Sequence, residues 1–117
     1  MFQRAAILVT TLLVAAAPAL AHAVPKTMTP APDSTISAPT EISMVFSEEL
    51  EPKFSVIRLL DSSGAVVSKA ASVLDPADSK HMTLALPKLT PGIYTVQWTS
   101  SATDGHRLSR SYTFTVK

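Results

Sequence analysis

The sequence predicts an all-β domain built as a sandwich of short strands, and three observations lead to this prediction. Apolar and polar residues alternate in several short stretches, which is typical of strands with one buried face. Turn signals separate these stretches at a spacing that is common in β-sandwiches. After residue 22 no segment has a convincing helical period, and the one short candidate, residues 47–54, is interrupted by Pro52.

Six strands are expected from this pattern. The clearest, residues 41–47, places Ile42, Met44 and Phe46 on one face. The other five are residues 54–60, 65–73, 81–86, 92–100 and 111–116, and residues 23–28 add a seventh if they pair. Residues 29–40, which are rich in Pro and Ser, are expected to form a loop. We expect the alternating apolar residues, with Trp98 and Phe114 among them, to form the core.

One short segment points to the kind of sandwich. The stretch LTPGIY, residues 89–94, resembles the tyrosine corner of immunoglobulin-like domains. In such a corner, a Tyr that opens a strand returns its hydroxyl to nearby backbone. Tyr94 is therefore expected to bind the main chain just upstream.

The first 21 residues have the pattern of a secretory signal peptide. Arg4 supplies a positive charge, and residues 5–17 form an apolar run of 13 residues without a charge. Ala19 and Ala21 then give the small-residue end at which such peptides are cut.

Cleavage after Ala21 would leave one mature domain, residues 22–117, with His22 as its first residue. The alternative is a retained membrane anchor, because the apolar run just reaches spanning length if it is extended through Ala23. Pro18 and the small-residue end favour cleavage. We therefore predict an exported, periplasmic protein.

Composition excludes several classes of protein. Without Arg4 the chain has nine Lys and Arg against nine Asp and Glu, so it offers no basic surface for nucleic acid. There is no cysteine, which excludes disulfide-linked partners, thiolate metal sites and a blue-copper centre. A chain of this size without disulfides must fold on its apolar core alone.

The histidines are the residues most able to carry chemistry. Asp104 and His106 flank a glycine that can adopt positive φ, so one tight turn could aim both side chains at a single point. A free α-amine on His22 would add a second nitrogen beside its ring, and together these groups offer three nitrogens and one oxygen. Such a set without sulfur suits Cu(II). The amine must lose its proton to bind, so affinity should weaken as pH falls.

The order of motifs resembles the CopC/PcoC family of small periplasmic copper-resistance proteins. The matching stretches are HA at the expected new N-terminus, PAP in the first loop, APTEISMVFSE, FSVIRLLDSSG, LTPGxYxVxW, SxTDGH and a final SYTFTVK. The resemblance covers nearly all of residues 22–117. It implies a Greek-key, cupredoxin-like sandwich or barrel that binds Cu(II) through His22, Asp104 and His106. It also places Glu48 near the site, where the carboxylate would orient a ligand or a water.

One feature of some family members is missing. They carry a methionine-rich loop for Cu(I), whereas Met28, Met44 and Met82 are dispersed in this sequence. Met44 and Met82 are expected in the core, so we predict one Cu(II) site and no dedicated Cu(I) site. His81 is a weaker candidate for a copper contact and is expected to be solvated at the start of a strand.

Three functions are compatible with these residues. The first is a non-enzymatic protein for copper resistance or transfer, whose partner would be an inner-membrane copper importer or a copper-protein assembly factor. The second is a copper-dependent oxidative enzyme with an N-terminal histidine brace. This is disfavoured because most of the seven aromatic residues are expected in the core. The third is a metal-free immunoglobulin-like interaction module. Zinc is an alternative metal for a His, His and Asp set.

Overall fold

The computed structural model describes residues 10–12 and 22–117. The predicted signal peptide lies outside the described residues except for residues 10–12, so its cleavage stays a prediction. In the described part of the chain there is no helix with the length and hydropathy needed to cross a membrane.

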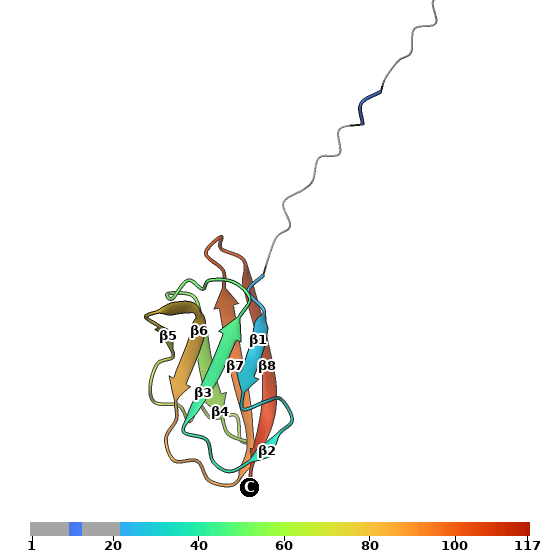
Figure 1. The fold of residues 1–117 in the computed structure, drawn as a ribbon. Coiled ribbons are helices and arrows are strands. Elements are labelled where there is room, and N and C mark those ends of the chain that lie inside the picture. Colours follow the sequence, from blue (N-terminus) through green and yellow to red (C-terminus); the bar gives the residue numbers. More distant parts are fainter. Residues whose placement is uncertain (1–9, 13–21) are drawn as a thin grey trace, which may run out of the picture.

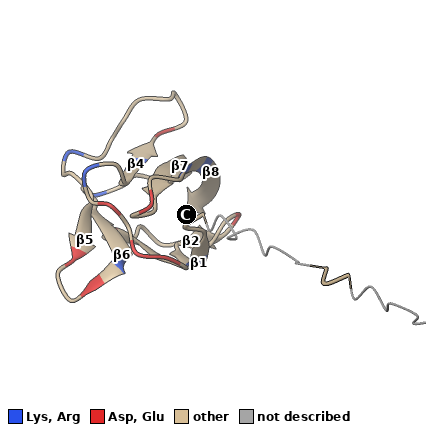
Figure 2. Ribbon diagram, turned by 90° about the horizontal axis from the view of Figure 1, so that it is seen from above, with Lys and Arg blue, Asp and Glu red and all other residues tan. Residues whose placement is uncertain are grey.

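Two four-stranded sheets form the domain (Figure 1). They confirm the predicted β-sandwich, although the sequence pattern leads us to expect only six or seven strands. The first sheet has the order β1 (Pro25–Thr29), β3 (Glu41–Phe46), β6 (Asp78–Ala85) and β5 (Val73–Asp75). The second has the order β2 (Thr35–Ile36), β8 (Arg107–Val116), β7 (Gly92–Ser101) and β4 (Val56–Leu60). Neighbouring strands are antiparallel except for the short parallel pair of β2 and β8. Seen from above, β1, β5 and β6 lie in one layer, and β4, β7 and β8 lie in the other (Figure 2).

Alternating side chains from both sheets fill the space between the layers. Ile42, Met44 and Phe46 of β3 are each 0% exposed, which confirms the face predicted for this strand. Phe46 meets Trp98 of the opposite sheet edge to face, with ring centroids 5.6 Å apart. Phe114 of β8 is also buried. The core therefore joins the two layers through residues that the sequence pattern identifies.

The tyrosine corner is also present. The hydroxyl of Tyr94 donates a hydrogen bond to the carbonyl oxygen of Thr90 at 2.7 Å. Its ring is buried and stacks on Phe114 with centroids 5.9 Å apart. This contact fixes the turn that starts β7, the strand that leads to the Asp-Gly-His loop.

The edge strands differ from the prediction. Residues 65–72 form no strand, and the expected strand over residues 65–73 is replaced by a single bridge between Leu60 and Val66 and by the later strand β5. The expected loop of residues 29–40 contains the two-residue strand β2. Short edge segments are specified by neighbouring strands more than by their own alternation.

The three methionines of the described chain are dispersed in sequence but form one row in the structure. Met28 pairs with Met44 across β1 and β3, and Met44 pairs with Met82 across β3 and β6. Met44 and Met82 are 0% and 1% exposed, which confirms their predicted place in the core.

Candidate metal centre

The main chain after His22 is held in place by two serines. Ser100 of β7 donates its hydroxyl to the carbonyl oxygen of Ala23 at 2.6 Å. Ser47, just after β3, accepts the Val24 N–H through its Oγ at 3.0 Å, and its own N–H binds the Val24 carbonyl at 2.8 Å. Ala23 is fully buried while His22 remains exposed. The start of the domain is thus fixed at the ends of β3 and β7, and the His22 side chain points outward.

The Asp-Gly-His loop is a tight turn between β7 and β8. Gly105 has φ of 91°, the positive value that the sequence suggests. Its N–H binds the carbonyl of Ala102, and the Ala102 N–H binds the carbonyl of His106, both at 2.9 Å. Asp104 Oδ1 accepts the His106 N–H at 3.1 Å. The loop therefore holds Asp104 and His106 on one side of the turn through local hydrogen bonds.

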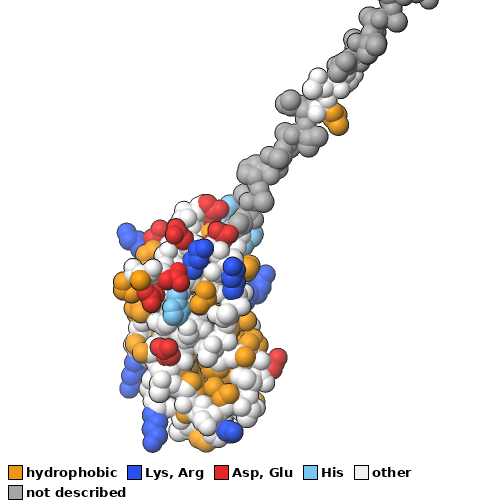
Figure 3. All heavy atoms as spheres, in the orientation of Figure 1, with side chains coloured by type: hydrophobic (Ala, Val, Ile, Leu, Met, Phe, Trp, Pro, Cys, Tyr) orange, Lys and Arg blue, Asp and Glu red, His pale blue; other side chains and the backbone are white. Residues whose placement is uncertain are grey.

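The fold brings His22 and His106 together although 84 positions separate them in the sequence. Their ring centroids are 5.6 Å apart and the rings are nearly perpendicular, at 78°. Asp104 Oδ1 lies 3.1 Å from Nδ1 of His106. All three residues that the sequence suggests as ligands therefore lie together. Figure 3 shows histidine side chains at the end of the domain where the described part begins.

The ring nitrogen of His106 that faces Asp104 is buried and has no hydrogen-bond partner of acceptable geometry. The 3.1 Å contact is thus a close approach of two polar atoms and not a formed hydrogen bond. Donation from the His106 backbone N–H is the main cause that lowers the pKa of Asp104, and the nearby ring of His106 adds to it. Asp104 is therefore ionised at neutral pH, as a metal ligand must be.

These separations fit a metal ion. Nitrogen and oxygen ligands lie about 2.0–2.2 Å from Cu(II) or Zn(II), so adjacent ligand atoms are roughly 3 Å apart. The 3.1 Å between Asp104 Oδ1 and His106 Nδ1 matches this spacing. An ion bound to an imidazole nitrogen lies roughly 3 Å from the ring centroid, so a centroid separation of 5.6 Å is short enough for one ion to bind both rings if a nitrogen of each ring faces it.

The expected ligand set is not assembled in the chain that retains residues 1–21. Among the described residues, no three His, Asp or Glu side chains are grouped so that they would hold a metal ion. The main-chain nitrogen of His22 here belongs to a peptide bond with Ala21, so it lacks the free amine. Glu48 is exposed in the loop after β3, and in the described chain no hydrogen bond or ion pair joins it to His22, Asp104 or His106.

The sequence places His81 at the start of a strand, but in the structure it lies inside one. Strand β6 begins three residues earlier, at Asp78. The His81 side chain is 29% exposed and its Nε2 is 2.7 Å from the hydroxyl of Ser43. The expectation of a strand start is therefore wrong, and the ring is half-buried.

Ser47 and Ser100 are site residues that the sequence analysis does not identify. Their hydroxyls fix residues 22–24. Ser47 lies within the matching stretch APTEISMVFSE, which assigns it no role, and Ser100 lies outside the matching stretches. The one signal available is that each Ser ends a strand with strong alternation, close to where the sandwich must meet the start of the domain.

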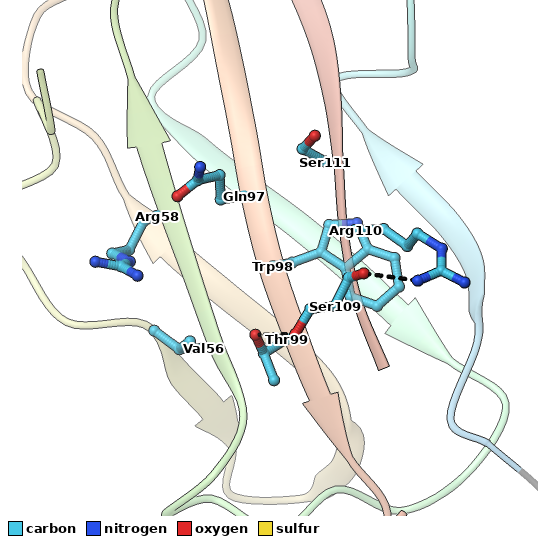
Figure 4. Close-up of a pocket in the computed structure, with 8 residues that line it drawn as sticks. All are labelled: Val56, Arg58, Gln97, Trp98, Thr99, Ser109, Arg110 and Ser111. Atoms are coloured by element: carbon cyan, nitrogen blue, oxygen red, sulfur yellow. Dashed lines mark hydrogen bonds between the residues drawn. The ribbon is translucent and has the colours of Figure 1, made fainter. Parts of the chain in front are cut away.

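The pocket found in the described chain lies elsewhere. It has a volume of about 560 Å³ and opens on the outer face of β4, β7 and β8 (Figure 4). Arg58, Gln97 and Ser111 are among its lining residues, and Arg110 donates to the Ser109 carbonyl at 2.8 Å. None of the proposed ligands lines it.

Fold and site together define a small two-sheet β-sandwich with a candidate metal centre where the domain begins. The chain belongs to the CopC family: the model of the CopC domain matches residues 25–117. It is 38% identical over 107 residues to Copper resistance protein C of Escherichia coli, covering 85% of this chain and 84% of that protein. The protein is thus a member of a copper resistance and transport family.

Solved structures agree with this assignment. The crystal structure of CopC from Methylosinus trichosporium OB3b superposes with a TM-score of 0.76 at 29% identity, covering 82% of this chain and 94% of the other. The crystal structure of PcoC, a methionine-rich copper resistance protein from Escherichia coli, superposes with a TM-score of 0.68 at 34% identity. The match covers 83% of this chain and 100% of the other. Copper transport protein CutJ of Bacillus subtilis is 29% identical over 98 residues, which are 82% of this chain and 18% of that protein. The two matches to solved structures confirm the β-sandwich that the sequence predicts.

Proposed function

We propose that the chain is exported to the periplasm, is cut after Ala21, and then binds one Cu(II) ion. The ligands are the new α-amine and ring of His22, the carboxylate of Asp104 and the ring of His106. The observation that carries the proposal is the approach of the His22 and His106 rings to 5.6 Å with Asp104 beside them. The relatives are named as copper resistance proteins, which supports copper as the bound metal. The ligand set of nitrogen and oxygen atoms supports Cu(II) as its oxidation state.

Cleavage acts as the step that completes the site. Ser47 and Ser100 already fix residues 22–24, so the cut changes the chemistry of one nitrogen with little rearrangement. Before the cut His22 offers one ring nitrogen, and after it the amine and ring close a chelate on the metal. We propose a further role for Glu48 as an outer carboxylate that orients a bound water, since it directly follows Ser47.

We propose that the protein stores or transfers copper and is not an enzyme. The centre is formed by exposed or half-exposed groups, so a partner can compete for the ligands: the Asp104 side chain is 50% exposed and that of His106 is 33% exposed. The relatives carry copper-resistance or copper-transport names. A stretch like this chain occurs within the longer Copper transport protein CutJ, which supports an inner-membrane copper importer or an assembly factor as the partner.

The decisive experiment compares two forms of one chain. Residues 22–117 with a free amine and the same residues with an acetylated amine are titrated with Cu(II) against a competing chelator. The free-amine form should bind one ion at least about 100-fold more tightly, because a chelating nitrogen is lost in the acetylated form. Equal affinity would overturn the proposal, and tighter binding of zinc than copper would overturn the choice of metal. The mass of the protein from its native host checks the cut after Ala21.

A further inference from the structure

A second group of side chains of metal-ligand type lies on the outer face of the sheet formed by β1, β3, β6 and β5. His81 of β6 stands between Ser43 of β3 and Asp75 of β5. Its Nε2 is 2.7 Å from the Ser43 hydroxyl, and its Nδ1 is 3.7 Å from Asp75 Oδ2. This arrangement is separate from the candidate centre and contains none of its residues.

Both potential ligands are oriented by other hydrogen bonds. Asp75 Oδ1 accepts the Ala77 N–H at 2.7 Å at the turn between β5 and β6, which directs Oδ2 towards His81. The Ser43 hydroxyl is placed to accept a proton on His81 Nε2, and in that tautomer the lone pair of Nδ1 faces Asp75. A histidine that binds metal usually donates its other nitrogen to such a partner.

The distance between the two atoms suits a shared cation better than a direct contact. At 3.7 Å, Nδ1 and Oδ2 are too far apart for a hydrogen bond. Bonds of about 2.0–2.2 Å from one ion reach both atoms when the angle between the bonds is somewhat wider than tetrahedral. In the described chain no Lys or Arg forms an ion pair with Asp75, so its carboxylate has no competing side-chain cation.

We propose that Asp75 and His81 form a second binding site for a divalent transition metal ion, with Cu(II) bound most tightly. Two protein ligands hold the ion and water fills the remaining positions. No third His or carboxylate in the described chain joins the pair, so the site is weaker than the candidate centre. Side-chain exposures of 29% for His81 and 40% for Asp75 leave the ion accessible to solvent.

The pair lies near acidic surface and away from the start of the chain. Figure 2 shows acidic segments where β5 meets β6, and Figure 3 shows histidine beside acidic side chains on the body of the domain as well as near the grey segment. The ligands belong to the β5–β6 hairpin, six positions apart, so the site needs no free α-amine. It raises the copper capacity of the chain and operates in both the cut and uncut forms.

The test uses residues 22–117 with an acetylated N-terminus, in which no amine chelate can form. Cu(II) is titrated and followed by electron paramagnetic resonance, which distinguishes the nitrogen ligands of each bound ion. His81→Gln should remove one class of bound copper, lowering its affinity at least about 10-fold. Asp75→Asn keeps an oxygen for the Ala77 N–H and should lower the affinity of the same class about 10-fold.

Two further variants separate ligands from neighbours. Ser43→Ala should weaken the site several-fold while its nitrogen signature persists, because Ser43 positions the ring without touching the ion. Asp78→Asn is the matched control: its Oδ1 already accepts the Lys80 N–H, so copper binding should stay within about twofold.

The outcomes are distinct from those of the proposed function. Unchanged copper binding in His81→Gln overturns the second site and leaves the candidate centre untouched. Loss in His81→Gln with no effect of Asp75→Asn shows a lone surface histidine and also overturns the proposed pair. In free-amine protein, intact tight binding by each variant shows that the variant is folded.

Discussion

The two histidine sites are built in opposite ways. The candidate centre joins His22 to a loop 84 positions later, and it depends on two sheets meeting at one end. The two ligands of the Asp75–His81 pair lie within one hairpin and are brought together by the register of β5 and β6, while Ser43 of β3 orients the His81 ring. As we propose them, the first site gathers more ligands but needs both the whole fold and a chain cut, whereas the second forms within one hairpin with fewer ligands. The structure therefore predicts that mutations will affect the two sites separately.

His106→Ala should produce the largest difference in copper binding between the two sites. It removes a ring that approaches His22 to 5.6 Å, so tight Cu(II) binding should fall by about 100-fold or more. Binding at Asp75 and His81 should stay within twofold. Chelator competition measures the tight site, and spin resonance at higher copper measures the weaker one. A parallel loss at both sites would mean that they are coupled and would contradict the comparison.

Ser100→Ala tests the long-range part of the candidate centre. Its hydroxyl is the hydrogen-bond donor to the buried Ala23 carbonyl, and a buried group left without a partner costs about 1–3 kcal/mol. We expect the free energy of unfolding to fall by that amount and copper affinity to fall several-fold, because His22 is less firmly placed. Urea unfolding and copper titration measure the two effects.

Ser109→Ala is a matched control for that change. Ser109 lies on the exposed outer face of the same sheet and its hydroxyl contacts Thr99 at 2.8 Å. Removal of the Ser109 hydroxyl should change the free energy of unfolding by less than about 1 kcal/mol and leave copper affinity unchanged. Equal effects of the two serine variants would show that the Ser100 contact does not position His22.

The sequence predicts the strands of the core better than the edges. Ile42, Met44 and Phe46 alternate because one face of β3 is buried, and this pattern is visible without any partner strand. Residues 65–72 also look like a strand, yet only Val66 forms a bridge, because pairing of an edge depends on its neighbour. The methionine row could not be predicted, since it arises from the register of β1, β3 and β6.

The candidate centre is predictable only in part, for the same reason. Asp104 and His106 flank a glycine, so their turn can be identified from local sequence alone. Ser47 and Ser100 act through contacts over 23 and 77 positions, and the local sequence does not reveal these contacts. The bond between Ser43 and His81 spans 38 positions and depends on how β3 and β6 pair.

Gly105→Ala tests the local part of the candidate centre. At φ of 91° an added Cβ meets no atom within 4 Å, so the cost is conformational and amounts to about 1–2 kcal/mol. We expect Cu(II) affinity to fall up to about 10-fold as the loop relaxes and turns Asp104 from His106. Gly64→Ala, at φ of 84° in a distant turn, carries a similar strain and should leave copper binding unchanged. Equal loss in both variants would attribute the effect to general instability.

Tyr112→Phe should have the smallest effect and should spare both sites. The Tyr112 hydroxyl donates to the Pro30 carbonyl at 2.9 Å, and burial raises its pKa to about 12. An unfolded chain ionises tyrosine near pH 10, so between pH 10 and 12 the unfolded state releases a proton that the folded state retains. The contribution of Tyr112 to stability is thus present below pH 10 and is lost as pH rises through about 12.

At neutral pH the free energy of unfolding of Tyr112→Phe should therefore be about 1 kcal/mol lower than that of the wild type, because one hydrogen bond is lost. Above pH 10 the stability difference between wild type and Tyr112→Phe should shrink, because only the wild type carries this ionisation. Urea unfolding at pH 7, 10 and 11 measures it, with copper stoichiometry as the readout for the two sites. A difference that is constant across this range would show that burial of Tyr112 does not resist ionisation, and altered stoichiometry would show that the loop at Pro30 is coupled to a metal site.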